Sequence, residues 1–368
     1  MGKKQNIFDS SFVIDGVSEA LTPSELLRGS LPSCPPGGAS GQVFVDESID
    51  PMPVAFSYNP DRIRKYLSLT RKTIREFPTF FSGAYTTQKI AASLLELLPR
   101  KGHFRLEDLS VKAIWRWNDS RMGNMAAFYE SVMQAADCLD ALSLPLLSYK
   151  AEFPSDSLGV DFVPLVSKNP SEAEEDLDYT AEKRDAVIGT GLSCPRKLVP
   201  DLNSWIIYIP FDTVDYHLGG SLLNQALGIP GGGRAPELTC ADYFRDCYEV
   251  VREFVEDGLL LSACRVGDGG LLTALDSMTG TGVGALADVS DLLRANPSSD
   301  PVRVLFSEIP GVVIQIRDSD FDYTDAELLL QDVAYYPLGH PTSKSCKVEI
   351  CSGSGPGIQN ILDSLISR

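Results

Sequence analysis

The sequence predicts a mixed α+β or α/β protein built from two subdomains. The chain has 368 residues, 43% of them apolar, which is enough for two domains of ordinary size. Apolar runs typical of buried strands and amphipathic patterns typical of helices occur in both halves. Residues 195–203 contain two prolines and no periodicity, and so mark a boundary. We predict an arm over 1–49, an α+β subdomain over 50–198 and an α/β subdomain over 199–368.

The arm is predicted from the composition of the first 50 residues, which are rich in Gly, Pro and Ser. Its densest break runs from Pro32 to Gly38. Such a segment is typical of an extended lead-in rather than part of a core. Two short apolar runs that follow, at residues 43–45 and 53–56, fit strands.

In the N-terminal subdomain, apolar side chains recur at the spacing of helices, and short apolar runs indicate strands. Helices are expected at residues 63–74, 90–98 and 125–139, and strands at 111–115, 144–147 and 186–190. A break at Gly83 precedes the second helix. Residues 167–178 are acidic and aperiodic, so we predict an exposed loop there.

The C-terminal subdomain opens with an apolar run typical of a buried strand. Strands are expected at residues 205–210, 259–263 and 311–316, and helices at 240–257 and 358–365. Gly258 follows the first of these helices in the position of a C-terminal cap.

The charge balance excludes one class of partner. The 32 basic and 50 acidic residues give a net charge of −18, which disfavours binding to nucleic acid. The charges are unevenly spread: residues 61–112 hold 11 bases and 5 acids, and residues 151–190 hold 10 acids and 3 bases. We interpret the basic stretch as a solvated helix face, with an acidic partner or a phosphorylated ligand as the alternative.

Compartment and metal content are predicted from what the sequence lacks. No apolar run reaches the length of about 18–20 residues that spans a bilayer, and no secretory signal follows the N-terminus. The eight cysteines form no CxxC pair and none lies near a histidine at metal-ligand spacing. We expect reduced, buried thiols, no metal site, and a cytoplasmic or organellar-matrix location.

Glycine-rich turns are the candidate binding features. Gly219-Gly220-Ser221 and Asp268-Gly269-Gly270 each stand between a strand-like run and a helix, where backbone N–H groups favour an anion. Asp268 either caps the following helix or ligates a metal. A third stretch, residues 353–357, lacks the Lys-Ser/Thr of a P-loop and fits a linker. No GxSxG turn and no nucleophile close to a histidine is present, so we assign no catalytic residue.

The order of these segments resembles a known family. Residues 211–228 (FDTVDYHLGGSLLNQALG), 241–278, with its CRVGDGGL stretch, and 305–316 (LFSEIPGVVIQI) are similar to the second synthetase-like half of formylglycinamidine ribonucleotide synthase, of the aminoimidazole ribonucleotide synthetase superfamily. Residues 111–147 resemble its first subdomain more weakly. The resemblance implies a two-subdomain synthetase-like fold.

The departures from that family's pattern are chemical. Residues 146–150 read LLSYK, without the family's Asp, and Gly123-Asn124-Met125 replaces its Gly-Glu-Asp. Cys264-Arg265 replaces its His-Asp. The retained residues imply a vestigial ligand site with no catalytic group and no metal. The retained residues are Gly219, Gly220, Ser221, Asp268, Gly269, Gly270 and Glu308. Lys150 is the remaining candidate ligand residue, at the former phosphate site of the N-terminal subdomain.

Two functions follow from this resemblance. The first is a non-catalytic structural or assembly subunit, a pseudoenzyme that needs no cofactor. The alternative is an ATP-dependent ligase subunit that forms a C–N bond, uses ATP and Mg²⁺, and works with separately encoded glutaminase and synthetase partners. Because two such halves pack together in the family, we expect a protein partner or self-association through the N-terminal subdomain sheet.

Overall fold

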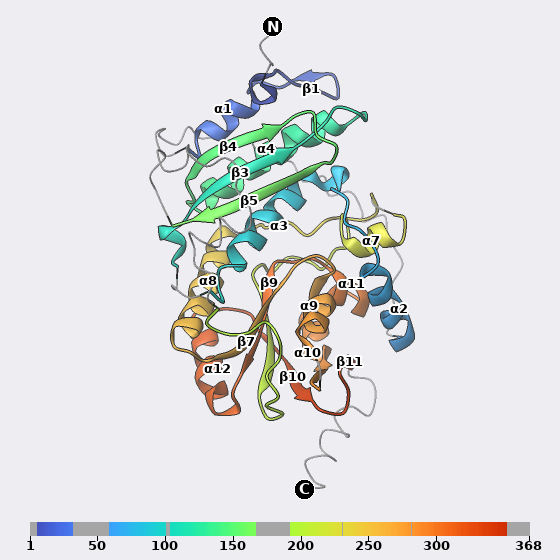
Figure 1. The fold of residues 1–368 in the computed structure, drawn as a ribbon, viewed down its shortest axis with the longest axis vertical. Helices are drawn as coiled ribbons and strands as arrows, with labels where there is room; N and C mark the ends of the chain where they lie inside the picture. Colours follow the sequence, from blue (N-terminus) through green and yellow to red (C-terminus); the bar gives the residue numbers. More distant parts are fainter. Residues whose placement is uncertain are drawn as a thin grey trace.

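The computed structural model describes residues 6–31, 59–100, 104–166, 192–229, 231–280 and 282–351 (Figure 1). The described elements before residue 200 are η1 (Ile7–Asp9), β1 (Val13–Ile14), β2 (Val17–Ser18), α1 (Pro23–Arg28), α2 (Pro60–Thr70), η2 (Thr79–Phe81), α3 (Ser82–Leu95), η3 (Leu106–Asp108), β3 (Ser110–Arg116), α4 (Asn124–Ala141), β4 (Leu146–Glu152) and β5 (Gly159–Leu165).

The described elements after residue 200 are β6 (Trp205–Pro210), α7 (Leu222–Ala226), α8 (Ala241–Glu256), β7 (Leu260–Val266), α9 (Gly270–Met278), β8 (Gly284–Asp288), α10 (Ser290–Ala295), α11 (Pro301–Phe306), β9 (Gly311–Ile316), η4 (Asp318–Asp320), α12 (Phe321–Leu330), β10 (Tyr336–Thr342) and β11 (Val348–Cys351).

Two main sheets organise these elements. The three-stranded sheet has the order β4-β3-β5, with β4 parallel and β5 antiparallel to β3. The six-stranded sheet has the order β11-β8-β10-β6-β9-β7, and β6, β9 and β7 at its centre and edge pair antiparallel. Strands and helices mix in both halves of the chain, so the predicted α+β class is confirmed.

One apolar core passes from one sheet to the other. In Figure 1, α3 lies between the three-stranded sheet above and the six-stranded sheet below. A single cluster of buried side chains includes Trp115 of β3, Phe128 of α4, Phe244 of α8 and Ile316 of β9. Ile63 of α2 belongs instead to a second cluster, which covers the other face of the six-stranded sheet. The division at residue 198 stays a prediction, and the packing across it is continuous.

The N-terminal segment corrects the predicted arm. Within residues 6–31, Phe8 is only 1% exposed, and its ring centroid lies 5.6 Å from that of Trp115 and 4.7 Å from that of Tyr149. The α1 helix begins with a capping box formed by Thr22. An extended lead-in is therefore wrong for these residues, because their aromatic side chains complete the core. Residues 32–58, including the two short predicted strands, lie outside the described residues.

Most elements with strong periodicity are confirmed. Strands β3, β6, β7 and β9 and helices α4 and α8 coincide with predicted segments, and Gly258 has the positive φ of a C-terminal cap (+70°). The predicted break between the two helices ends just before Gly83, which lies in the first turn of α3, where a Cβ would stand 2.6 Å from Gln134 Cγ of α4. Strands β5, β8, β10 and β11 were not predicted. The predictions for residues 167–178, 186–190, 353–357 and 358–365 lie outside the described residues.

No helix among the described residues is long and apolar enough to cross a membrane.

Candidate functional site

A buried carboxylate links the two predicted glycine turns. Glu308 precedes β9, and its side chain is 4% exposed. Its Oε1 accepts hydrogen bonds from the backbone N–H of Leu222 (2.8 Å) and of Gly269 (2.7 Å). Leu222 is the first residue of α7 and Gly269 is the N-cap of α9. Because helix N-termini leave N–H donors unpaired, one carboxylate satisfies a donor at each of the two helix starts.

Arg75, from the segment between α2 and α3, neutralises this carboxylate. Its guanidinium pairs with Glu308, lies 3.2 Å from Asp268 Oδ1, and donates to the Gly220 carbonyl at 2.9 Å. Burial lowers the pKa of Arg75, but the charges of Glu308 and Asp268 outweigh burial and raise it above its ordinary value. Burial raises the pKa of Glu308, and the Arg75 charge opposes that rise. The pair therefore holds both turns together by charge and hydrogen bonds.

The turns themselves depend on glycine for close backbone approach. A Cβ on Gly270, whose φ is +73°, would lie 2.6 Å from the backbone carbon of Phe306. A Cβ on Gly219 would lie 2.4 Å from the backbone carbon of Arg234. Ser221 Oγ accepts a hydrogen bond from Asn224 N at 3.2 Å and so caps α7. Gly219, Gly220, Ser221, Asp268, Gly269 and Gly270 thus meet around Glu308.

Lys150, the seventh predicted site residue, lies in another part of the fold. It is on β4 of the three-stranded sheet, and its Nζ is 3.4 Å from Glu152 Oε1. Figure 1 shows β4 in the upper sheet, while α7 and α9 lie beside the lower one. The candidate residues therefore lie in two places, six of them beside the six-stranded sheet and Lys150 on the three-stranded sheet.

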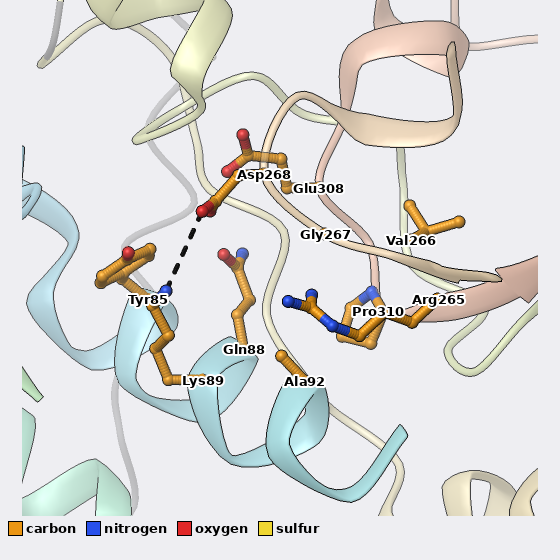
Figure 2. A pocket seen from close by; sticks show the side chains of 10 residues that line it. All are labelled: Tyr85, Gln88, Lys89, Ala92, Arg265, Val266, Gly267, Asp268, Glu308 and Pro310. Atoms are coloured by element: carbon orange, nitrogen blue, oxygen red, sulfur yellow. Dashed lines mark ion pairs between the residues drawn. The ribbon is translucent and has the colours of Figure 1, made fainter. Parts of the chain in front are cut away.

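The helix-capping role predicted for Asp268 also needs correction. Gly269, and not Asp268, is the N-cap of α9, and no side chain caps that helix. The Asp268 carboxylate instead faces Arg75 and Lys89, whose Nζ is 4.0 Å away (Figure 2). Within the described residues, no group of three or more His, Cys, Asp or Glu side chains is arranged to hold a metal ion.

The sequence did not single out Arg75, between α2 and α3, or the residues that α3 contributes. Arg75 is 13% exposed, and its guanidinium carbon and Lys89 Nζ lie 4.7 and 5.0 Å from the ring centroid of Tyr85. Both cations belong to the basic stretch of residues 61–112. The solvated-face interpretation is therefore wrong for Arg75, and also for the buried Arg100 and Lys112. The excess of bases was the available signal, but the buried acid that Arg75 meets lies more than 200 residues away.

Two adjoining pockets open beside this cluster, between α3 and the end of β7. Figure 2 shows the first, with side chains of α3 on one side and Arg265 to Asp268 on the other. The second has a volume of about 230 Å³ and reaches Cys264 and Ser277, whose Sγ and Oγ atoms are 3.3 Å apart.

The described cysteines are all free thiols, but not all are buried. Cys138, Cys194 and Cys247 are buried as predicted, and burial raises the pKa of Cys247 to about 12. Cys240 and Cys346 are exposed, so the buried interpretation is wrong for them.

Comparison with known proteins gives the class: the chain has an aminoimidazole ribonucleotide synthetase-like fold and is similar in sequence to formylglycinamidine ribonucleotide synthases. The structure of Thermotoga maritima PurL complexed with FGAR matches it with a TM-score of 0.50 at 13% identity, over 76% of this chain and 42% of that one. That likeness shows the fold. PurLQS from the same organism matches with a TM-score of 0.47 at 9% identity, over 76% and 41% of the two chains.

The proteins that are similar in sequence are much longer than this chain. Human phosphoribosylformylglycinamidine synthase is 25% identical over 224 residues, which are 58% of this chain. The Schizosaccharomyces pombe protein of that name is 32% identical over 124 residues, which are 33% of this chain. A probable membrane antigen 3 of Saimiriine herpesvirus 2 is 27% identical over 160 residues, or 43% of this chain. The matches span only 15%, 9% and 12% of these three relatives. No family model matches the chain.

Proposed function

We propose that the chain is a non-catalytic structural or assembly module on a synthetase-like scaffold. The observation that carries this proposal is the absence of carboxylates from residues 146–150 and 123–125, and the position of Glu308 agrees with it. The Glu308 carboxylate lies at the N-termini of α7 and α9, where the glycine turns would receive the anion of a ligand. Arg75 supplies the matching positive charge from within the chain. The two turns are thus satisfied by the protein's own side chains.

The chemistry of β4 supports the same proposal. Mg²⁺ with a nucleotide needs one or two carboxylates in addition to phosphate oxygens. Residues 146–150 offer none, Leu146 and Leu147 are buried, and Lys150 is close to Glu152. The nearby turn before α4 presents Gly123 and Asn124, which add no carboxylate.

Calorimetric titration with ATP and Mg²⁺ tests the proposal. We expect no saturable heat at ligand concentrations up to the millimolar range. The alternative, an ATP-dependent purine-biosynthesis subunit, is favoured by the names of the two synthase relatives. It predicts a Kd below about 10 μM, roughly −7 kcal/mol, that is lost in Lys150→Ala. That result would overturn the non-catalytic assignment.

The surface proposed for association is the outer face of the three-stranded sheet. Val111, Ala113 and Trp115 of β3 pack into the core, so Ile114, between them, points to the opposite face. Ion pairs of Arg116 with Asp161 and of Lys150 with Glu152 flank Ile114 on the paired strands. This face suits a protein partner, and a second copy of the chain is the simplest one to test.

Native mass spectrometry of the purified chain measures this association. We expect a dimer whose dissociation constant is higher in Ile114→Lys, so that the variant dissociates at a higher protein concentration than the unmodified chain. Leu330→Lys is the matched control, because Leu330 is an exposed leucine of α12, which lies beside the six-stranded sheet. The assembly role is contradicted if the purified chain is a monomer and also binds no protein from its native source.

A further inference from the structure

We propose that the outward face of α12, together with a row of carboxylates on the neighbouring α8, binds a basic amphipathic helix of another protein. This surface is separate from the glycine turns and from the outer face of the three-stranded sheet. The proposal therefore goes beyond the assembly role above and does not depend on it. It rests on an exposed apolar stripe, on the acidic side chains that border the stripe, and on the contact between the two helices.

The outward face of α12 is apolar. Thr324 and Leu328 are the buried residues of this helix, and Leu328 belongs to the core cluster. On the opposite side, Leu329 and Leu330 are 65% and 76% exposed. Residues three, four and seven apart share one side of a helix, and the exposed residues at this spacing are Tyr323, Ala326, Leu329 and Leu330. Single exposed apolar side chains are common, but a continuous stripe of them is typical of an interaction site.

Carboxylates border this apolar stripe. Residues 318–332, which include α12, hold six acidic residues and no basic one. Partial burial raises the pKa of Tyr323, and so do three nearby carboxylates, those of Glu327, Asp257 and Glu253. The last two belong to the end of α8, so acidic side chains of both helices lie beside the stripe.

The acidic side chains of α8 form a ridge along that helix. Their spacing of three and four residues places them on one side, and they are Asp242, Asp246, Glu249, Glu253 and Glu256. The ridge stays negative although α8 also holds two arginines. The side chain of Arg252 is only 5% exposed and is shared by three of these carboxylates, while Arg245 pairs with Asp242. Among the described residues, Asp246 has no ion pair.

The stripe and the ridge belong to one surface. In Figure 1, α8 and α12 lie side by side along the six-stranded sheet. The backbone N–H of Ala334, just after α12, donates to the Tyr243 hydroxyl of α8 at 2.9 Å. Because packed helices are about 8–10 Å apart, a single helix that lies along this surface can contact both the stripe and the ridge.

The chemistry of the surface fits one kind of partner. Apolar side chains at helical spacing would cover the stripe, and Lys or Arg beside them would pair with the ridge, which together describe a basic amphipathic helix. A second copy of this chain would bring the same carboxylates to the surface. Nucleic acid and anionic membranes would bring phosphates. Charge repulsion disfavours all three.

Fluorescence anisotropy with a labelled model peptide tests the proposal on the full chain. The probe is a synthetic peptide of leucine and lysine, with the leucines on one helix face and lysines at the other positions. We expect saturable binding at about 0.15 M salt that weakens as the salt concentration rises. A peptide of the same composition, shuffled so that no helix face is apolar, should bind at least about tenfold more weakly, because it matches the ridge but not the stripe.

Substitutions on the chain locate the bound peptide. Leu329→Gln combined with Leu330→Gln should lower the affinity about tenfold or more. Val17→Gln is the matched control and should bind like the unmodified chain. Val17 is 66% exposed, and its strand β2 pairs with β1, which lies at the far end of the molecule from α12 in Figure 1. Glu327→Gln combined with Asp257→Asn keeps the stripe, and should lower the affinity several-fold and reduce its salt dependence.

The acidic double variant keeps the test valid if the leucine double variant fails to fold. The proposal is overturned by the absence of saturable binding, by equal affinity for the shuffled peptide, or by a leucine double variant that binds as tightly as Val17→Gln. Self-association that is weakened by Leu330→Lys but not by Ile114→Lys would also overturn it, because a second copy would then occupy this surface. Failure of the non-catalytic assignment is distinguishable, because it appears as Mg²⁺-dependent ATP binding that depends on Lys150.

Discussion

Glu308 shows how one side chain can replace a bound anion. Glycine turns at helix starts present N–H groups to whatever negative charge lies beside them. Here that charge is a carboxylate of the same chain, 2.7 Å from Gly269 N and 2.8 Å from Leu222 N. The same turn sequence is therefore compatible with ligand binding and with internal packing.

Removing this carboxylate should be costly. Glu308→Ala leaves the Leu222 and Gly269 N–H groups and the buried Arg75 without their acceptor, so we expect a loss of about 3–5 kcal/mol in the free energy of unfolding. Glu308→Gln keeps an acceptor oxygen and should cost less. Urea unfolding followed by circular dichroism measures both. Glu107→Ala, at an exposed carboxylate, is the control and should change stability by under about 0.5 kcal/mol. Equal effects of Glu308→Ala and Glu107→Ala would contradict the linking role.

The glycine of the second turn is constrained by space as well as by φ. We expect Gly270→Ala to cost about 2–5 kcal/mol, since the new Cβ is both strained at φ +73° and pressed against the Phe306 backbone. Gly258 has a similar φ of +70° with nothing within 4 Å, so Gly258→Ala should cost only about 1–2 kcal/mol. Thermal and urea unfolding of the two variants compare them directly. Equal stability of Gly270→Ala and Gly258→Ala would show that the turn containing Gly270 can move away from the Phe306 backbone.

At the scale of elements, the N-terminal segment is part of the fold rather than an appendage. The η1 turn places Phe8 against β3, α4 and β4, and α1 packs beside α4. Aromatic rings at this spacing add edge-to-face contacts to the burial of their area. The Gly/Pro-rich composition that indicated an arm belongs mainly to residues after 31.

Phe8→Ala tests the contribution of that segment. The side chain is nearly fully buried, so its removal should lower the free energy of unfolding by about 3–5 kcal/mol. Val13→Ala, at an exposed position on β1, should change it by under about 0.5 kcal/mol. Denaturant unfolding monitored by tryptophan fluorescence is suitable, because Phe8 contacts the ring of Trp115. If Phe8→Ala and Val13→Ala change the free energy of unfolding equally, the N-terminal segment does not contribute to stability in solution.

At the scale of the whole molecule, the two apolar clusters bury several phenols. Burial raises the pKa of Tyr208, Tyr216 and Tyr248 above the ordinary value near 10, and burial together with Asp325 raises the pKa of Tyr335 to about 12. These groups keep their protons in the folded state at a pH where the unfolded chain has lost them.

The folded state therefore binds more protons than the unfolded state above about pH 10, and the free energy of unfolding should fall as pH rises there. We expect little pH dependence from these tyrosines between pH 7 and 9, and a steep loss from about pH 10 to 12. Urea unfolding across this range measures the slope, and absorbance at 295 nm reports phenol ionisation in the folded protein and in urea. Phenols that titrate alike in both states would contradict the burial argument.

Much of the element pattern could be predicted from the sequence, and the failures have physical causes. The strand at Trp205–Pro210 and the helix at Ala241–Glu256 have strong periodicity and were found. The strand at Tyr336–Thr342 contains two prolines and a glycine with φ +133°, and carries no strand signal. A break was predicted at Gly83 because the sequence does not distinguish a glycine at a helix–helix contact from a glycine in a turn.

The sequence by itself determined the fold class, the order of the glycine turns and the absence of Asp and Glu from residues 146–150. These features are local, since periodicity and turn residues depend on near neighbours. The tertiary structure alone decided that Glu308 fills both turns, that Arg75 neutralises it, that Lys150 lies apart, and that Arg265 faces a pocket. Each of these depends on residues more than 30 positions apart in the chain. Local patterns specify which face of an element is buried, but not which side chain lies opposite it.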